Sequence, residues 1–145
     1  MSSTRRLASL NLVHRVKTHT LETIGAELSE LRAQQADITA EQSALSEQVA
    51  FEAANTTSDS YAFLSGYLQS ADRRQQHLAA QLAELEDRAS AIEGQLLEAF
   101  RDVKTNEAVK GQTVQEIKQH AERSEVQELD DANRALYLLK KSGKT

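Results

Sequence analysis

The sequence contains no proline, no cysteine and no tryptophan, and only five of its 145 residues are glycine. Without cysteine it has no disulfide, no thiol nucleophile and no thiolate metal ligand. Aromatic residues make up 4% of the chain, whereas charged residues make up 27%. A compact core needs turn residues and large apolar side chains, so this composition argues against a globular domain.

The residues that are abundant are Ala, Glu, Gln, Leu, Arg and Lys, which lose little side-chain freedom in a helix. We therefore expect long helices with few loops. The net charge of -5 and the dispersed basic residues argue against a nucleic-acid partner. No apolar run is long enough to span a bilayer. The basic first twenty residues resemble a transit peptide, but we interpret them as helix because a hydrophobic repeat already begins at Leu7.

Two seven-residue repeats organise the chain. The first has mostly apolar residues at its a and d positions: Leu7, Leu10, His14, Lys17, Leu21, Ile24, Leu28, Leu31, Gln35, Ile38, Gln42, Leu45 and Val49. The second is more apolar: Tyr61, Leu64, Leu68, Ala71, Gln75, Leu78, Leu82, Leu85, Ala89, Ile92, Leu96, Ala99 and Val103. Such stripes are buried between supercoiled helices, and their polar members specify register. Each repeat therefore predicts one strand of a coiled coil.

The segment between the repeats, residues 54–60, is rich in residues that favour caps and turns. We expect a first helix at about 5–53, a turn at about 54–59 capped by Ser58 or Asp59, and a second helix at about 60–141. The fold class is then all-α, one coiled-coil domain over residues 1–145: an antiparallel two-helix hairpin with a longer, overhanging C-terminal helix. Facing residues should have numbers that add to about 111.

This register places Leu7 level with about Lys104. The same phase beyond Val103 brings polar residues such as Asn106 and Thr113 into the seam. We therefore expect residues 104–141 to overhang as a single helix of about 55 Å. The overhang carries an apolar stripe, which predicts partner binding or, alternatively, self-association. The stripe consists of Val126, Leu129, Ala132, Leu136 and Leu139.

Four of the six aromatic residues lie close to the turn: Phe51, Tyr61, Phe63 and Tyr67. Only Tyr61 fits the seam. The others either cap the turn or anchor another protein. A two-helix hairpin has no enclosed interior, the histidines lack chelating spacing and the glycines stand alone, so we expect no catalytic residue, metal site, cofactor or small-molecule substrate.

The segment from Ala99 to Glu107, with Glu125 and Leu129-Asp130-Asp131 further on, resembles the C-terminal helix of the flagellar FliJ proteins. The stretch from Tyr61 to Leu68 and the Leu7-x-x-Leu10 start also resemble that family. FliJ proteins are small stalk components of type III protein export. The resemblance covers most of the chain.

The resemblance implies a non-enzymatic cytoplasmic protein, peripherally associated with the inner membrane at the flagellar base. Its implied partners are a hexameric export ATPase, an export gate protein and export chaperones, and we expect the free chain to be monomeric. The overhang would enter the ATPase ring, and the tip would contact the gate or chaperones. The ring contacts that this predicts are Lys104, Glu107, Glu125, Leu129, Asp130, Leu136 and Leu139. The tip contacts are Phe51, Tyr61, Phe63 and Tyr67. The alternative is a homodimeric coiled-coil rod or scaffold unrelated to secretion.

Overall fold

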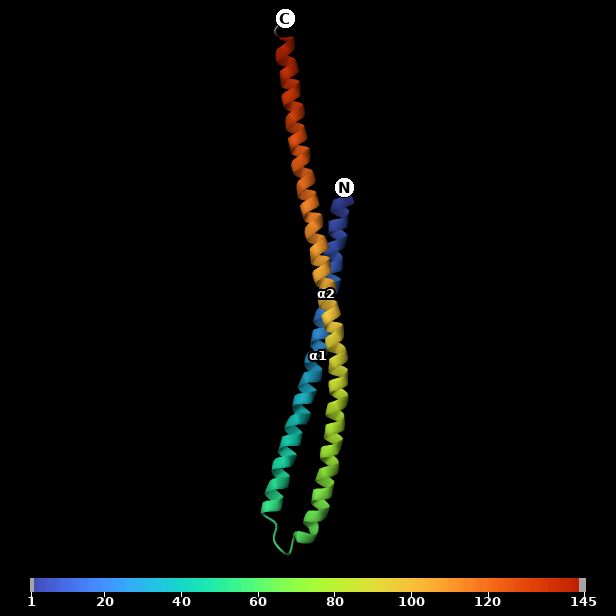
Figure 1. Cartoon of the computed structure of the whole chain (residues 1–145), viewed down its shortest axis with the longest axis vertical. Coiled ribbons are helices and arrows are strands. Elements are labelled where there is room, and N and C mark those ends of the chain that lie inside the picture. The colour runs from blue at the N-terminus through green and yellow to red at the C-terminus, as the bar shows by residue number, and fades with distance from the viewer. Residues whose placement is uncertain (1, 144–145) are drawn as a thin grey trace. The chain divides into compact units, whose positions relative to one another are not determined.

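The structure is a computed structural model that describes residues 2–143. These residues form two α-helices, α1 (Ser2–Ala54) and α2 (Tyr61–Ser142), joined by one short loop (Figure 1). The chain divides into two compact units. The hairpin unit is Thr20–Ala99, and the terminal unit combines Met1–His19 with Phe100–Thr145. Within each unit the two helical segments run antiparallel, which confirms the all-α helical hairpin.

The seven-residue repeats correctly predict which residues are buried. Every a and d position of the first repeat is buried or half-buried, as are those of the second repeat from Ala71 to Val103. A cluster of Leu31, Leu85, Ala89 and Ile92 forms the core of the hairpin unit. Leu68 and Tyr61 are exceptions, because 37% and 71% of their surfaces are exposed. The placement of Tyr61 in the seam is therefore wrong.

The loop connects the helices through local hydrogen bonds. At the end of α1, the Asn55 side chain donates to the Phe51 carbonyl at 2.8 Å and the Thr56 hydroxyl donates to the Glu52 carbonyl at 2.6 Å. These bonds satisfy carbonyl groups that a helix end leaves free. At the start of α2, the Ser60 carbonyl accepts the first helical bonds, so Ser60 occupies the capping position expected for Ser58 or Asp59.

The register between the helices differs from the expected one. The sum of about 111 predicts Gln42 opposite Gln69, but the Gln42 carbonyl accepts a hydrogen bond from Gln75 Nε2 at 3.0 Å. The expected register assumed that the second seam starts at Tyr61. Tyr61 is exposed, so that seam starts later. Glu86 shows the same offset, because the expected register places it opposite Gly25 but its carboxylate accepts a hydrogen bond from Gln35, which lies further toward the loop.

The same correction applies in the terminal unit and shortens the predicted overhang. Asn106 and Thr113 are buried, and Ile117 is half-buried. Asn106 Nδ2 donates to the Leu10 carbonyl at 3.3 Å, and the Thr113 hydroxyl donates to the Val109 carbonyl at 3.0 Å. A buried polar side chain is tolerated once it is hydrogen-bonded, so these residues continue the seam rather than end it. The unpacked part of α2 therefore begins after Ile117, not at Lys104.

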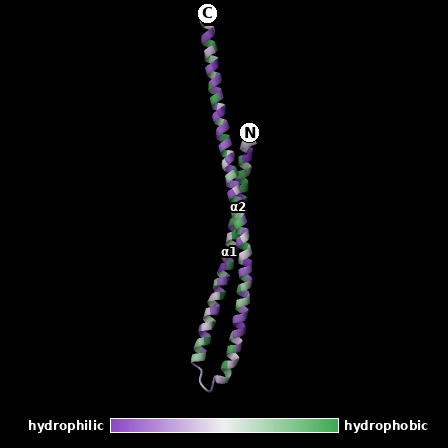
Figure 2. Cartoon of the chain, viewed as in Figure 1, coloured by the Kyte–Doolittle hydropathy of each residue, from purple (hydrophilic) through white to green (hydrophobic). Residues whose placement is uncertain are grey.

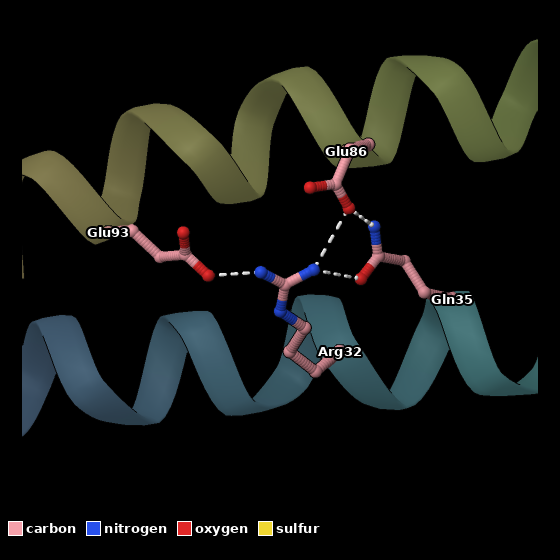
Figure 3. Close-up of polar contacts among 4 residues, drawn as sticks. All are labelled: Arg32, Gln35, Glu86 and Glu93. Carbon is pink, nitrogen blue, oxygen red and sulfur yellow. Dashed lines mark hydrogen bonds and ion pairs between the residues drawn. The ribbon is translucent and has the colours of Figure 1, made fainter.

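A polar network fixes the register inside the hairpin unit (Figure 3). Arg32 of α1 lies between Glu86 and Glu93 of α2 and forms an ion pair with each. Gln35 accepts a hydrogen bond from Arg32 at 2.8 Å and donates one to Glu86 at 2.7 Å. The interpretation of Gln35 as a register-specifying seam residue agrees with this geometry, because sliding one helix would break all of these contacts.

We expect acid to weaken the hairpin unit through Glu86. The hydrogen bond from Gln35, and then the hydrogen bond and charge of Arg32, lower the pKa of Glu86 below its ordinary value. A lowered carboxyl pKa contributes stability above the unfolded-state pKa, and this is lost as pH falls through the folded-state pKa. The ion pair between Arg32 and Glu86 is exposed to solvent, so its contribution to the stability of the hairpin unit is modest.

Thermal melting followed by circular dichroism from neutral pH down to about pH 3 measures this effect. Glu86→Gln should melt with a smaller dependence on acidic pH than the parent. Glu30→Gln, which removes an exposed carboxylate of α1 outside the Arg32 network, is the control and should keep the parental dependence. Identical pH profiles for Glu86→Gln and the parent would contradict the role of Glu86.

Candidate protein-interaction surfaces

The last part of α2 forms the most exposed surface of the terminal unit. Every residue from 118 to 143 is exposed, and α2 continues here past the beginning of α1 (Figure 1). We call residues 118–142 the free segment. At roughly 1.5 Å per residue it is about 37 Å long. An isolated helix of this length has no tertiary packing to stabilise it, so the free segment is a candidate contact surface.

Hydrophobic residues recur along the free segment among hydrophilic ones (Figure 2). Six of them are large and at least half exposed: Val126, Leu129, Leu136, Tyr137, Leu138 and Leu139. Exposed apolar surface that recurs on one helix face is typical of an interaction site. The predicted stripe is therefore exposed in the structure.

The stripe lies on a different face of α2 from the seam. Within the terminal unit the seam follows Val103, Asn106 and Thr113, and its continuation beyond Ile117 is polar from His120 to Arg134. From Thr113 to Leu129, a helix that turns by about 100° per residue rotates to nearly the opposite side. A partner that approaches the stripe therefore does not displace α1 from its seam.

The predicted ring contacts fall in two places. Glu125, Leu129, Asp130, Leu136 and Leu139 lie on the free segment, and all five are exposed. By contrast, Lys104 and Glu107 lie on the part of α2 that packs against α1. They form an ion pair with each other at 3.2 Å, and the Lys104 ammonium lies 5.4 Å from the centre of the Phe100 ring. The structure therefore does not bring Lys104 and Glu107 together with the other five.

The aromatic residues near the loop form a second surface, which we call the hairpin tip. Phe51, Tyr61 and Phe63 are exposed, and Tyr67 is half-buried. Phe63 and Tyr67 border a groove of about 270 Å³ beside the loop. The Tyr67 hydroxyl is buried without a hydrogen-bond partner. Exposed aromatic side chains are frequent anchors at protein interfaces, so the hairpin tip is the second candidate surface.

A further apolar face, which the repeats do not predict, lies on α1 in the terminal unit. Leu12, Val13 and Val16 are exposed although they are large and apolar. Leu12 and Val16 occupy positions of the repeat that point away from the seam, and Val13 occupies one that flanks it. The signal was present in the sequence, because Leu12 and Val16 are four residues apart and fall outside the a and d positions.

Two other kinds of site are absent from the described residues. Residues 2–143 contain no group of three His, Asp or Glu side chains arranged to hold a metal ion. No helix in the same range combines the length and the hydropathy needed to cross a bilayer. The chain was also compared with protein-family models, with curated proteins and with solved structures, and no match was found in any of the three.

Proposed function

We propose that the chain is a non-enzymatic stalk component of flagellar type III protein export. In this proposal the free segment binds the ring of a hexameric export ATPase, and the hairpin tip contacts the export gate or export chaperones. Two features support it: the resemblance of residues 99–107, 125 and 129–131 to FliJ proteins, and an antiparallel hairpin whose second helix ends in an unpacked, partly apolar segment. The location that follows is the cytoplasmic face of the inner membrane at the flagellar base.

The observation that carries the proposal is the orientation of the free segment. Its apolar stripe is exposed and lies away from the seam, so ring subunits can contact Leu129 and Leu136 while α1 remains packed on α2. Charged residues lie on the faces of the free segment beside the apolar stripe. Ring subunits placed around the helix would therefore contact faces of different chemistry. A stalk shifts the equilibrium between ring states only by binding them with different affinities, and an uneven helix surface meets that requirement.

The experiment compares ATP hydrolysis by a purified flagellar export ATPase with and without this chain. The key variant ends at His120, because a cut at Val103 would remove Asn106 and Thr113 and unpack the beginning of α1. We expect the full chain to stimulate hydrolysis and the shortened chain to have no effect. Circular dichroism establishes that the shortened chain keeps its hairpin.

Equal stimulation by both chains would place the ring contact outside the free segment. The absence of stimulation by either chain, with an ATPase able to form hexamers, would overturn the stalk proposal and favour a coiled-coil scaffold.

A further inference from the structure

Charge is distributed unevenly along the free segment. Residues 122–131 carry five acidic side chains against the single base Arg123. Residues 132–143 carry Arg134, Lys140 and Lys141 and no acid. All of these residues are exposed. The first half of the free segment is therefore acidic, and the second half is basic.

The apolar stripe is arranged evenly about the point where the charge changes sign. Val126 and Leu129 precede the midpoint between Ala132 and Asn133 by the same numbers of residues as Leu139 and Leu136 follow it. All four large side chains are more than half exposed. A stripe with this symmetry complements an inverted copy of itself.

We propose that the free segment binds a second copy of this chain in antiparallel orientation, with a two-fold axis near Ala132 and Asn133. Leu129 of one copy then lies level with Leu136 of the other, and Val126 lies level with Leu139. The acidic half of each copy lies along the basic half of its partner, so Glu125 approaches Lys140. This inference concerns self-association and does not depend on the proposed export function.

Charge decides the orientation of the pair. In a parallel pair the acidic halves would lie side by side, and like charges across a helix interface are unfavourable. The antiparallel pair places opposite charges together at both ends. It also leaves each copy's seam intact, because the stripe faces away from the α1 side of α2. A two-fold contact of this kind closes at two copies and does not propagate.

Sedimentation equilibrium of the full chain tests the pairing. From about 1 µM to about 500 µM we expect the mass to rise from monomer toward dimer. Leu136→Asp should remain monomeric throughout this range. Leu97→Asp, at a half-exposed leucine of α2 outside the free segment, is the matched control and should dimerise like the parent. A parental chain that stays monomeric at the highest concentration would overturn the proposal, as would dimerisation of Leu136→Asp.

Charge reversal tests the orientation. The double variant Lys140→Glu with Lys141→Glu should weaken self-association about tenfold or more, and so should Glu125→Lys with Glu128→Lys. An equimolar mixture of the two variants should form mixed dimers, because each then offers the charge that the other lacks. If the mixture pairs no better than either variant alone, the second copy is not antiparallel and the proposal fails.

Single cysteines give an independent measure, because the native chain has none. Asn133→Cys lies near the proposed axis and should form a disulfide-linked dimer on mild oxidation. Val126→Cys lies on the same face, but its two copies would be roughly 20 Å apart in the antiparallel pair and should not cross-link. Efficient cross-linking of Val126→Cys would indicate a parallel pair and contradict the inference.

Discussion

Leu31→Ala should destabilise the hairpin unit by about 2 to 5 kcal/mol. Leu31 retains only 3% of its surface exposed and packs in the cluster of Leu85, Ala89 and Ile92. Truncation to alanine removes buried apolar atoms and leaves a cavity that two stiff helices fill poorly. Few residues of the described chain are buried, and small domains are stable by only about 5 to 15 kcal/mol. One seam leucine therefore contributes a large share of the total free energy of unfolding.

Urea unfolding followed by the helical circular dichroism signal measures this loss. Leu12→Ala makes the same change on the same helix, but Leu12 is 57% exposed, so this control should lie within about 0.5 kcal/mol of the parent. Leu31→Met keeps the volume and should cost less than about 1.5 kcal/mol. Equal urea midpoints for Leu31→Ala and Leu12→Ala would mean that the seam does not pass through Leu31.

The sequence predicts the buried faces well but not how the two faces are aligned. A seven-residue repeat reports which residues share one side of a helix, and this is a local property. The alignment of two helices depends on which residue after the loop is the first to pack in the second seam. Tyr61 has the right phase and an apolar ring, yet it is exposed next to the loop. Nothing in the periodicity distinguishes it from Leu64.

The length of the free segment was also overestimated, and the cause is chemical. Asn106 and Thr113 are polar, and polar residues at seam positions predict that the seam ends there. In the structure, hydrogen bonds to the carbonyls of Leu10 and Val109 allow their burial. Ile117, which continues the same phase, was the signal in the sequence that the seam extends further. The placement of Lys104 and Glu107 among free ring contacts depended on the same error.

The Arg32 network contains ion pairs between the helices that the seven-residue repeats do not predict. Gln35 is recognisable from the sequence as a polar residue in the seam. The pairing of Arg32 with both Glu86 and Glu93 depends on the register, since the expected offset places other residues opposite Arg32. Flanking ion pairs between helices therefore become predictable only after the seam has been aligned.

Leu136→Asp should abolish stimulation of the export ATPase while leaving the melting temperature of the hairpin unchanged. Leu136 is 60% exposed on the free segment and lies outside the hairpin unit, so its replacement removes no buried contact. An aspartate in the middle of the stripe interrupts the apolar contact surface, and its desolvation at an interface is unfavourable. The measurements are ATP hydrolysis and co-sedimentation with the ATPase, with Leu97→Asp as the matched control.

Leu136→Asp is also expected to prevent self-association, so a second variant is needed to separate the two roles of the stripe. Lys140→Glu with Lys141→Glu should weaken the antiparallel pair but keeps Val126, Leu129 and Leu136 in place. If the ring binds the monomer through the apolar stripe, this variant should still stimulate hydrolysis. At high chain concentration it should stimulate hydrolysis more than the parent does, because a second copy then occupies the stripe of the parent. Loss of stimulation in the charge variant would show that the basic end of the free segment contacts the ring. Normal stimulation by Leu136→Asp would exclude the apolar stripe from ring binding, and self-association would then be the role of the stripe.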